Sequence, residues 1–201
     1  MQSMVIAVYD KAYNYYRQGL FFLFLQTVRK VNVLVPRWLQ AQLLEAHIYR
    51  ANKAVLSEIR ILQAMLYPKL PIEMDAAMQA EAWSLLGAVY SFIGRNEDAK
   101  EAFLASAGTE INKEQQMVEY SNAIFVSNYF GTSVKEFQEL YKSYCGLFAD
   151  VTPYPLRFCS HRKLRIGYLS ADFRQHPVAY FSAVLLEKFN RDRFEVYCYA
   201  F

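Results

Sequence analysis

Four polar side chains with the capacity for chemistry gather in one short segment of the sequence. They are Asp172, Arg174, Gln175 and His176, and Pro177 follows them directly. A proline is favoured in the first turn of a helix, so His176 is expected at a helix N-terminus, where free backbone N–H groups attract an anion. A neutral imidazole there can accept or donate a hydrogen bond, or act as a general acid or base.

The elements around this segment have the pattern of a β-α-β unit. Residues 164–170 and 194–200 are predicted as strands, and residues 177–189 as the helix between them. Strands joined by a helical crossover run parallel, and open α/β sheets bind ligands outside the carboxyl ends of their strands. The residues alone also allow a second interpretation, a tight turn in which Asp172 caps backbone N–H groups and His176 is merely exposed.

Composition argues against several other classes of site. Three cysteines and three histidines are scattered through 201 residues, which indicates neither a disulfide framework nor a metal site. The net charge of +3 is too small to suggest nucleic acid as a partner. The N-terminus lacks the pattern of a signal peptide, and no apolar run approaches the ~20 residues that span a bilayer. We therefore expect a cytoplasmic protein without metal or membrane contact.

Most of the chain before this unit has the periodicity of helical hairpins. Trp83, Leu86, Gly87 and Tyr90 reproduce the W-x-x-L-G-x-x-Y signature of a tetratricopeptide repeat. The turn and second helix supply its remaining positions, namely Gly94, Ala99 and Phe103. Gly87 and Ala99 allow the two helices to approach closely, and Asn96 is expected to cap the second one.

The same register extends to other hairpins. Small residues recur at Ala12, Ala46, Gly87 and Ser121, with spacings of 34, 41 and 34 residues. Sixteen residues after each lies an apolar residue, which gives the set Val28, Leu62, Phe103 and Phe137. The counterparts of Ala99 are Phe24, Glu58 and Ser133, of which only the serine is small. Four tetratricopeptide-type hairpins are predicted, although a generic helical array explains the first, second and fourth nearly as well.

Helices and boundaries follow from these patterns. The expected helices cover residues 4–17, 20–32, 37–50, 53–66, 74–93, 96–107, 113–129 and 133–147. The chain should divide into helical repeats at 1–149, a linker at 150–163 and an α/β segment at 164–201. Parallel sheets need cover on both faces, so this last segment is expected to begin a larger domain.

The α/β segment resembles a known family. Leu164 to Pro177, with its Asp-Phe-x-x-His-Pro motif, and Phe194 to Tyr199 are similar to the start of the catalytic region of O-linked N-acetylglucosamine transferases and their SPINDLY-like relatives. Residues 120–129 are similar to the connecting helix of bacterial members. The resemblance implies a mainly α protein, with tetratricopeptide-type hairpins before the start of a Rossmann-like (GT-B) glycosyltransferase domain. It places His176 near the sugar and the acceptor, with Asp172 in support. Where family members often carry a second histidine, this chain has Val178-Ala179-Tyr180-Phe181.

The resemblance also implies a function. The full-length protein would transfer a sugar from a nucleotide donor, such as a UDP-sugar, to protein Ser or Thr, with the repeats binding the protein acceptor. N-acetylglucosamine is the first expectation for the sugar and fucose the other, and no metal or further cofactor is implied. The 201 residues alone are expected to be inactive, because the family's nucleotide-binding half is not among them. The alternative is a non-catalytic repeat scaffold that binds a partner peptide in its groove. Homo-oligomer formation stays open.

Overall fold

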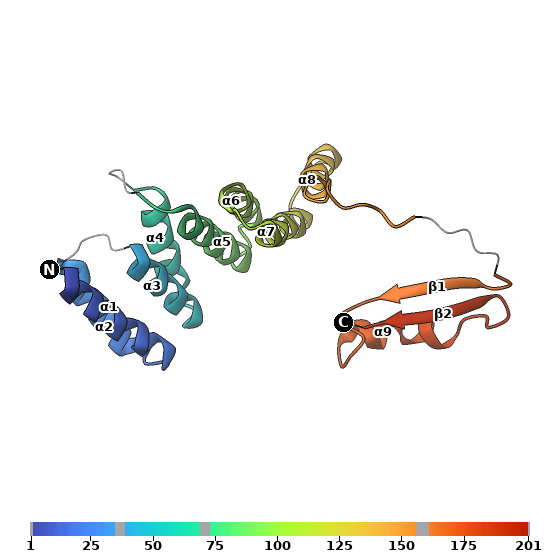
Figure 1. Cartoon of the computed structure of the whole chain (residues 1–201), viewed down its shortest axis with the longest axis horizontal. Helices are drawn as coiled ribbons and strands as arrows, with labels where there is room; N and C mark the ends of the chain where they lie inside the picture. The colour runs from blue at the N-terminus through green and yellow to red at the C-terminus, as the bar shows by residue number, and fades with distance from the viewer. Residues whose placement is uncertain (1, 35–38, 69–72, 156–160, 201) are drawn as a thin grey trace. The chain divides into compact units, whose positions relative to one another are not determined.

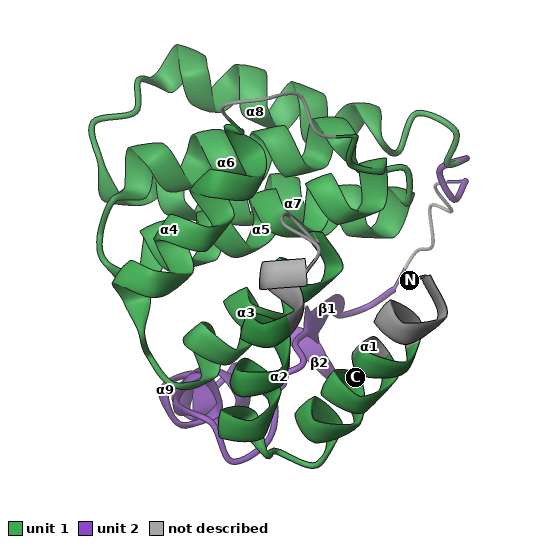
Figure 2. Cartoon of the chain, turned by 90° about the vertical axis from the view of Figure 1, so that its left-hand side faces the viewer, with its two compact units in different colours: residues 1–151 green, residues 152–201 purple. Residues whose placement is uncertain are grey.

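The computed structural model describes residues 2–34, 39–68, 73–155 and 161–200. The chain forms two compact units, Met1–Val151 and Thr152–Phe201 (Figure 2). The predicted linker at 150–163 includes residues 156–160, which lie outside the described residues.

The first unit consists of helices that follow one another along the chain (Figure 1). They are α1 Gln2–Arg17, α2 Phe21–Leu34, α3 Leu39–Ala51, α4 Val55–Leu66, α5 Ala76–Phe92, α6 Asn96–Thr109, α7 Lys113–Val126 and α8 Val134–Gly146, with a short 3₁₀ turn at Ser127–Tyr129 after α7. All eight predicted helices are present, and their ends differ from the prediction by only a few residues. The mainly helical fold class is therefore confirmed.

The repeat register holds in the first three hairpins. The small positions Ala12, Ala46 and Gly87 are buried. Ala99 and its counterparts in the other two hairpins, Phe24 and Glu58, are buried as well. So are the residues sixteen positions after each small residue, namely Val28, Leu62 and Phe103. One periodicity in the sequence therefore produces the same packing in α1–α2, α3–α4 and α5–α6.

Gly87 is a position of close helix approach, as its place in the signature predicts. A Cβ atom at Gly87 would lie 2.8 Å from the ring of Phe103 on α6. Carbon atoms in contact normally lie about 3.5–4.0 Å apart. The aromatic ring of one helix therefore packs directly on the backbone of the other.

The fourth hairpin does not follow the register. Ser121 is exposed, and the buried residues of α7 are Glu119, Ala123 and Val126. The helix turns this face toward α6, with which it packs extensively, whereas it meets α8 only lightly. No residue of α8 is buried. The prediction that Ser121 lies at an intra-hairpin contact is therefore wrong, because α7 packs mainly on the preceding helix.

The observed helix caps agree only in part with the caps expected from the sequence. Ser133 caps α8 through a capping box with Glu136, as a serine at this position favours. The expected Asn96 cap is wrong, because α6 begins at Asn96 and its N-cap residue is Arg95. The Nε of Arg95 instead donates to Asp98 Oδ2 at 2.7 Å, within the acidic first turn of the helix.

The second unit is the predicted β-α-β unit. Strand β1, Leu164–Leu169, pairs in parallel with β2, Phe194–Tyr199, and α9, Pro177–Glu187, lies between them in sequence. Arg165 and Glu195, which are paired across the strands, form an ion pair at 2.8 Å. None of the described residues in 152–201 is buried. Across the described residues of both units, no helix is long and apolar enough to cross a membrane.

Candidate functional site

His176 is the N-cap residue of α9. Its Nδ1 accepts a hydrogen bond from the backbone N–H of Val178 at 3.3 Å, and Pro177 occupies the first turn. The predicted helix start is therefore confirmed. The cap itself was not predicted, although a residue just before an N1 proline is the natural place to look for one. The imidazole here takes the role that a serine or aspartate oxygen usually has.

The loop before His176 is shaped by short local hydrogen bonds. The backbone N–H of Asp172 donates to Ser170 Oγ at 3.1 Å, and that of His176 donates to the Arg174 carbonyl at 2.7 Å. This turn brings Asp172 back toward the histidine, with Oδ2 3.7 Å from Nδ1. The two residues predicted as the site are therefore close to one another, and both side chains are partly exposed.

The two neighbours of Nδ1 favour different tautomers of His176. The N–H of Val178 can donate to Nδ1 only while that nitrogen carries no proton, and a neutral imidazole then has its proton on Nε2. The Asp172 carboxylate can be bonded only when Nδ1 does carry a proton, and Nε2 is then an acceptor. The 3.3 Å contact to Val178 is nearer to hydrogen-bond length than the 3.7 Å contact to Asp172. Nε2 is therefore a donor in the first tautomer and an acceptor in the second.

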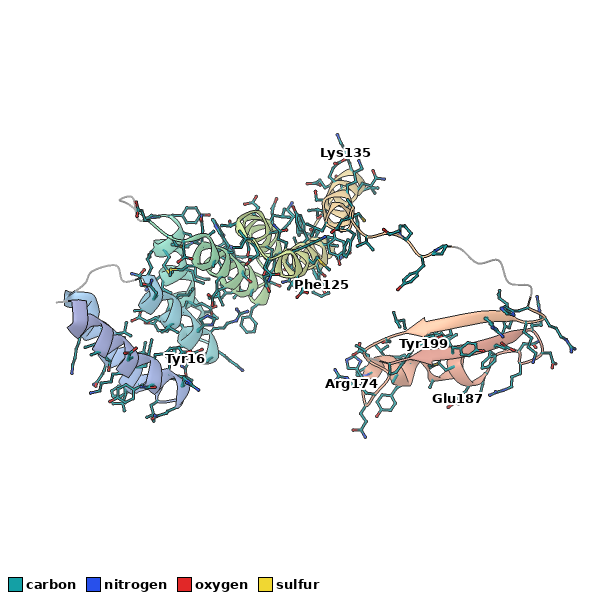
Figure 3. All side chains as sticks on the ribbon, in the orientation of Figure 1. Tyr16, Phe125, Lys135, Arg174, Glu187 and Tyr199 are labelled. Atoms are coloured by element: carbon teal, nitrogen blue, oxygen red, sulfur yellow. The ribbon has the colours of Figure 1, made fainter. Side chains whose placement is uncertain are left out.

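The other two candidate residues in this loop are Arg174 and Gln175. Arg174 is highly exposed, and one of its terminal nitrogens lies 3.9 Å from Asp172 Oδ1. Figure 3 shows Arg174 in the loop at the end of the sheet toward which the strand arrows point. Gln175 is exposed. The loop thus lies at the carboxyl end of β1, where α/β sheets bind ligands. Within the described residues, no group of His, Cys, Asp or Glu side chains could hold a metal ion.

Comparisons with known proteins bear on the family and the fold of the chain. Residues 150–201 match the sequence profile of Glycosyl transferase family 41. The fold is similar to a solved structure of a mutant O-GlcNAc transferase from Thermobaculum terrenum, with a TM-score of 0.56 and 22% sequence identity. That match covers 99% of this chain and 37% of the other, so the chain spans little more than a third of that protein's length. None of the curated proteins has a matching sequence.

The comparisons confirm the resemblance expected from the sequence in two respects. The α/β segment is related to Glycosyl transferase family 41. The helical hairpins followed by a parallel β-α-β unit are similar in fold to the matching third of a bacterial O-GlcNAc transferase. The matched segment contains both Asp172 and His176.

Proposed function

We propose that this chain carries the acceptor-binding repeats and the first β-α-β unit of a protein O-glycosyltransferase. The reaction would move N-acetylglucosamine from a nucleotide donor to a protein Ser or Thr. The observation that supports it most directly is the position of His176, 3.7 Å from Asp172, at the carboxyl end of β1. This pair lies within the segment that matches Glycosyl transferase family 41.

In this proposal, His176 acts on the acceptor hydroxyl. The hydroxyl oxygen forms a bond to the anomeric carbon of the sugar, the bond from that carbon to the donor phosphate breaks, and the hydroxyl proton must leave. With Nδ1 protonated and turned to Asp172, Nε2 can accept that proton, and the carboxylate stabilises the resulting imidazolium. With Nδ1 accepting from Val178, Nε2 can only donate, which suits binding of a sugar or phosphate oxygen.

The helical repeats would hold the acceptor while the α/β domain acts on it. Stacked hairpins present an extended surface suited to a peptide segment. The donor is expected to bind outside this chain's own residues, in the nucleotide-binding half that the family resemblance implies. The chain would therefore supply acceptor binding and one side of the reaction site.

Substitution of His176 in a protein that joins this chain to the nucleotide-binding half tests the proposal. His176→Ala should lower the transfer of labelled N-acetylglucosamine to a protein acceptor by about 10²–10⁴-fold, the range of a general acid or base. His161→Ala is the matched control, since His161 is exposed, precedes β1 and lies outside the loop. Circular dichroism of both variants reports whether the fold is retained.

Two results would contradict the proposal. If His176→Ala retains activity within about twofold of the parent protein, the histidine is a bystander. If no transfer occurs with any nucleotide sugar while a peptide still binds the helical unit, the chain belongs to a non-catalytic scaffold. An equal loss in His161→Ala would show that the effect does not arise in the loop.

A further inference from the structure

A hollow of about 530 Å³ lies between α5, α6 and α7 in the first unit. Its polar lining is strongly acidic and includes no lysine or arginine. The four carboxylate residues on its wall are Glu81, Glu110, Glu114 and Glu119. The hollow is thus a negatively charged site in a protein whose net charge is positive.

Glu119 is the unusual member of this group, because its side chain is buried. The residue is 1% exposed, and its Oε1 accepts hydrogen bonds from Ser84 Oγ at 2.8 Å and from Gln115 Nε2 at 2.9 Å. Its Oε2 is also buried, yet no described residue donates a hydrogen bond to it. One oxygen of this carboxyl group is therefore satisfied by two neutral donors, and the other is without a partner among the described residues.

A buried carboxylate without a cation is costly. Taking such a charge out of water costs several kcal/mol unless a positive group or further donors compensate. A metal ion does not fit, because no set of His, Cys, Asp and Glu in the described residues is placed to hold one. An organic cation fits better, since an ammonium or a guanidinium brings both the charge and the missing N–H donor.

The other three carboxylates line the same hollow and add negative charge to it, although two of them also have partners of their own. Glu110 Oε1 accepts the backbone N–H of Asn112, and Glu114 is in the first turn of α7. Glu81 Oε1 lies 2.7 Å from His47 Nε2. Gln115, which donates to Glu119, is an exposed residue, so its side chain can turn away and uncover the carboxylate.

We propose that this hollow binds one lysine or arginine side chain of a protein partner, with Glu119 as the counter-ion. The partner is a segment with a basic residue, because every charged residue of the lining is a glutamate, and the rest are neutral polar residues and two alanines. Identification of that partner as the glycosylation acceptor rests on the function proposed above, whereas the cation site itself does not.

Titration of the 201-residue chain with single amino-acid analogues tests the site directly. The probes are N-acetyl-lysine N-methylamide and its arginine counterpart, with the norleucine and citrulline analogues as uncharged matches. Two-dimensional amide NMR should show saturable shifts for residues around the hollow with the two cations only. Added salt should weaken these shifts, because the interaction is electrostatic.

Two substitutions locate the effect. Glu119→Gln keeps the size of the side chain and an oxygen for Ser84, and it should weaken binding of the cations about tenfold, the usual effect of losing a charge-assisted hydrogen bond. Glu114→Gln alters an exposed residue that cannot unfold the core, and it should weaken binding less. Glu101→Gln, an exposed residue of α6 that does not line the hollow, should leave binding unchanged.

Equal shifts with norleucine or citrulline would overturn the proposal, because the site would then recognise shape rather than charge. Unchanged binding in Glu119→Gln would also overturn it, since Glu119 would then not be the counter-ion of the bound cation. Glycosyl transfer is not measured in this titration. A failed transfer assay with intact lysine binding would therefore count against the enzyme alone, and the reverse result against the cation site alone.

Discussion

At the scale of single residues, Glu58 stands out because it occupies a core position of the repeat. It corresponds to Ala99 of the third hairpin, and only 2% of its surface is exposed. Its Oε1 has no hydrogen-bond partner among the described residues. Burial raises the pKa of the Glu58 carboxyl, while the charges of Arg50 and His47 oppose the shift. Where the repeat signature has a small apolar residue, the second hairpin thus buries an acid, and burial disfavours the charged form of that acid.

This burial predicts a pH-dependent effect of Glu58→Gln. A carboxyl whose folded pKa lies above its unfolded value stabilises the fold at low pH, and this contribution is lost as the pH rises through the folded pKa. The melting temperature of the variant should therefore be a few degrees above that of the parent near pH 8. Each kcal/mol of added stability raises the melting temperature of a unit of this size by about 2–4 °C. The difference should shrink toward zero below about pH 4.5, the ordinary pKa of a glutamate carboxyl. Melting curves of the parent and the variant across this pH range test the prediction. Glu101→Gln, which alters an exposed residue, is the control and should show no pH-dependent difference in melting temperature. A gain that does not depend on pH would contradict the assignment.

A second prediction at this scale concerns Asp172. In the proposed enzyme, Asp172→Asn should lower transfer less than His176→Ala, by about tenfold, because the imidazole remains but its cation loses a charged neighbour. Transfer assays on the parent protein, Asp172→Asn and His176→Ala under the same conditions measure this. A loss in Asp172→Asn as large as that in His176→Ala, or no loss at all, would contradict a supporting role for Asp172.

At the scale of elements, the third hairpin depends on a glycine at one helix contact. A Cβ at Gly87 would lie 2.8 Å from the ring of Phe103, whereas one at Gly108 of α6 would meet nothing within 4 Å. Both glycines lie within helices of the same hairpin. They therefore form a natural pair for separating the effect of space from that of helix propensity.

Gly87→Ala should destabilise the first unit by about 1–3 kcal/mol, the usual effect of overpacking, and Gly87→Leu by more. Gly108→Ala should instead stabilise it by about 0.4–1 kcal/mol, because alanine loses less backbone entropy and has room there. Urea denaturation followed by circular dichroism measures both changes. If the two alanine variants shift stability in the same direction, the close contact at Gly87 does not control the packing.

At the scale of the whole molecule, the two compact units differ in how much they bury. The first has a continuous apolar core from α3 to α7 and a second cluster across α1 to α3. In the second unit, no described residue is buried, and apolar side chains such as Leu169 and Phe181 are highly exposed. Two parallel strands with one helix cannot cover both faces of a sheet, so this unit should be much less stable by itself.

Hydrogen exchange on the 201-residue chain should therefore separate the two units. Amides of β1 and β2 should exchange at least about 100-fold faster than those of α5 and α6, because local opening is easiest where little apolar surface is buried. Exchange followed by mass spectrometry resolves these segments. Equal protection of β1 and α5 would mean that the sheet is covered by apolar contacts that the unit itself does not provide.

The sequence by itself determined the features that local periodicity controls in the first three hairpins and in the β-α-β unit. A repeating small residue with an apolar partner sixteen positions later predicts paired helices, and this held for Ala12, Ala46 and Gly87 because each hairpin packs mainly on itself. The strand, polar loop and proline around His176 likewise predict the β-α-β unit and place its loop at the carboxyl end of β1.

Only the tertiary structure decided which faces are buried and which polar groups meet. Ser121 fits the repeat spacing but is exposed, because α7 packs mainly on α6 and only lightly on α8. His176 became a helix cap within 3.7 Å of Asp172 through the turn at Ser170, which no spacing rule specifies.

Glu119 looks like an ordinary helix-surface acid in the sequence. It is buried because Ser84, 35 residues earlier on α5, and Gln115, one turn away on α7, enclose it. Contacts between residues distant in sequence depend on how the helices stack, and periodicity within one helix carries no information about that.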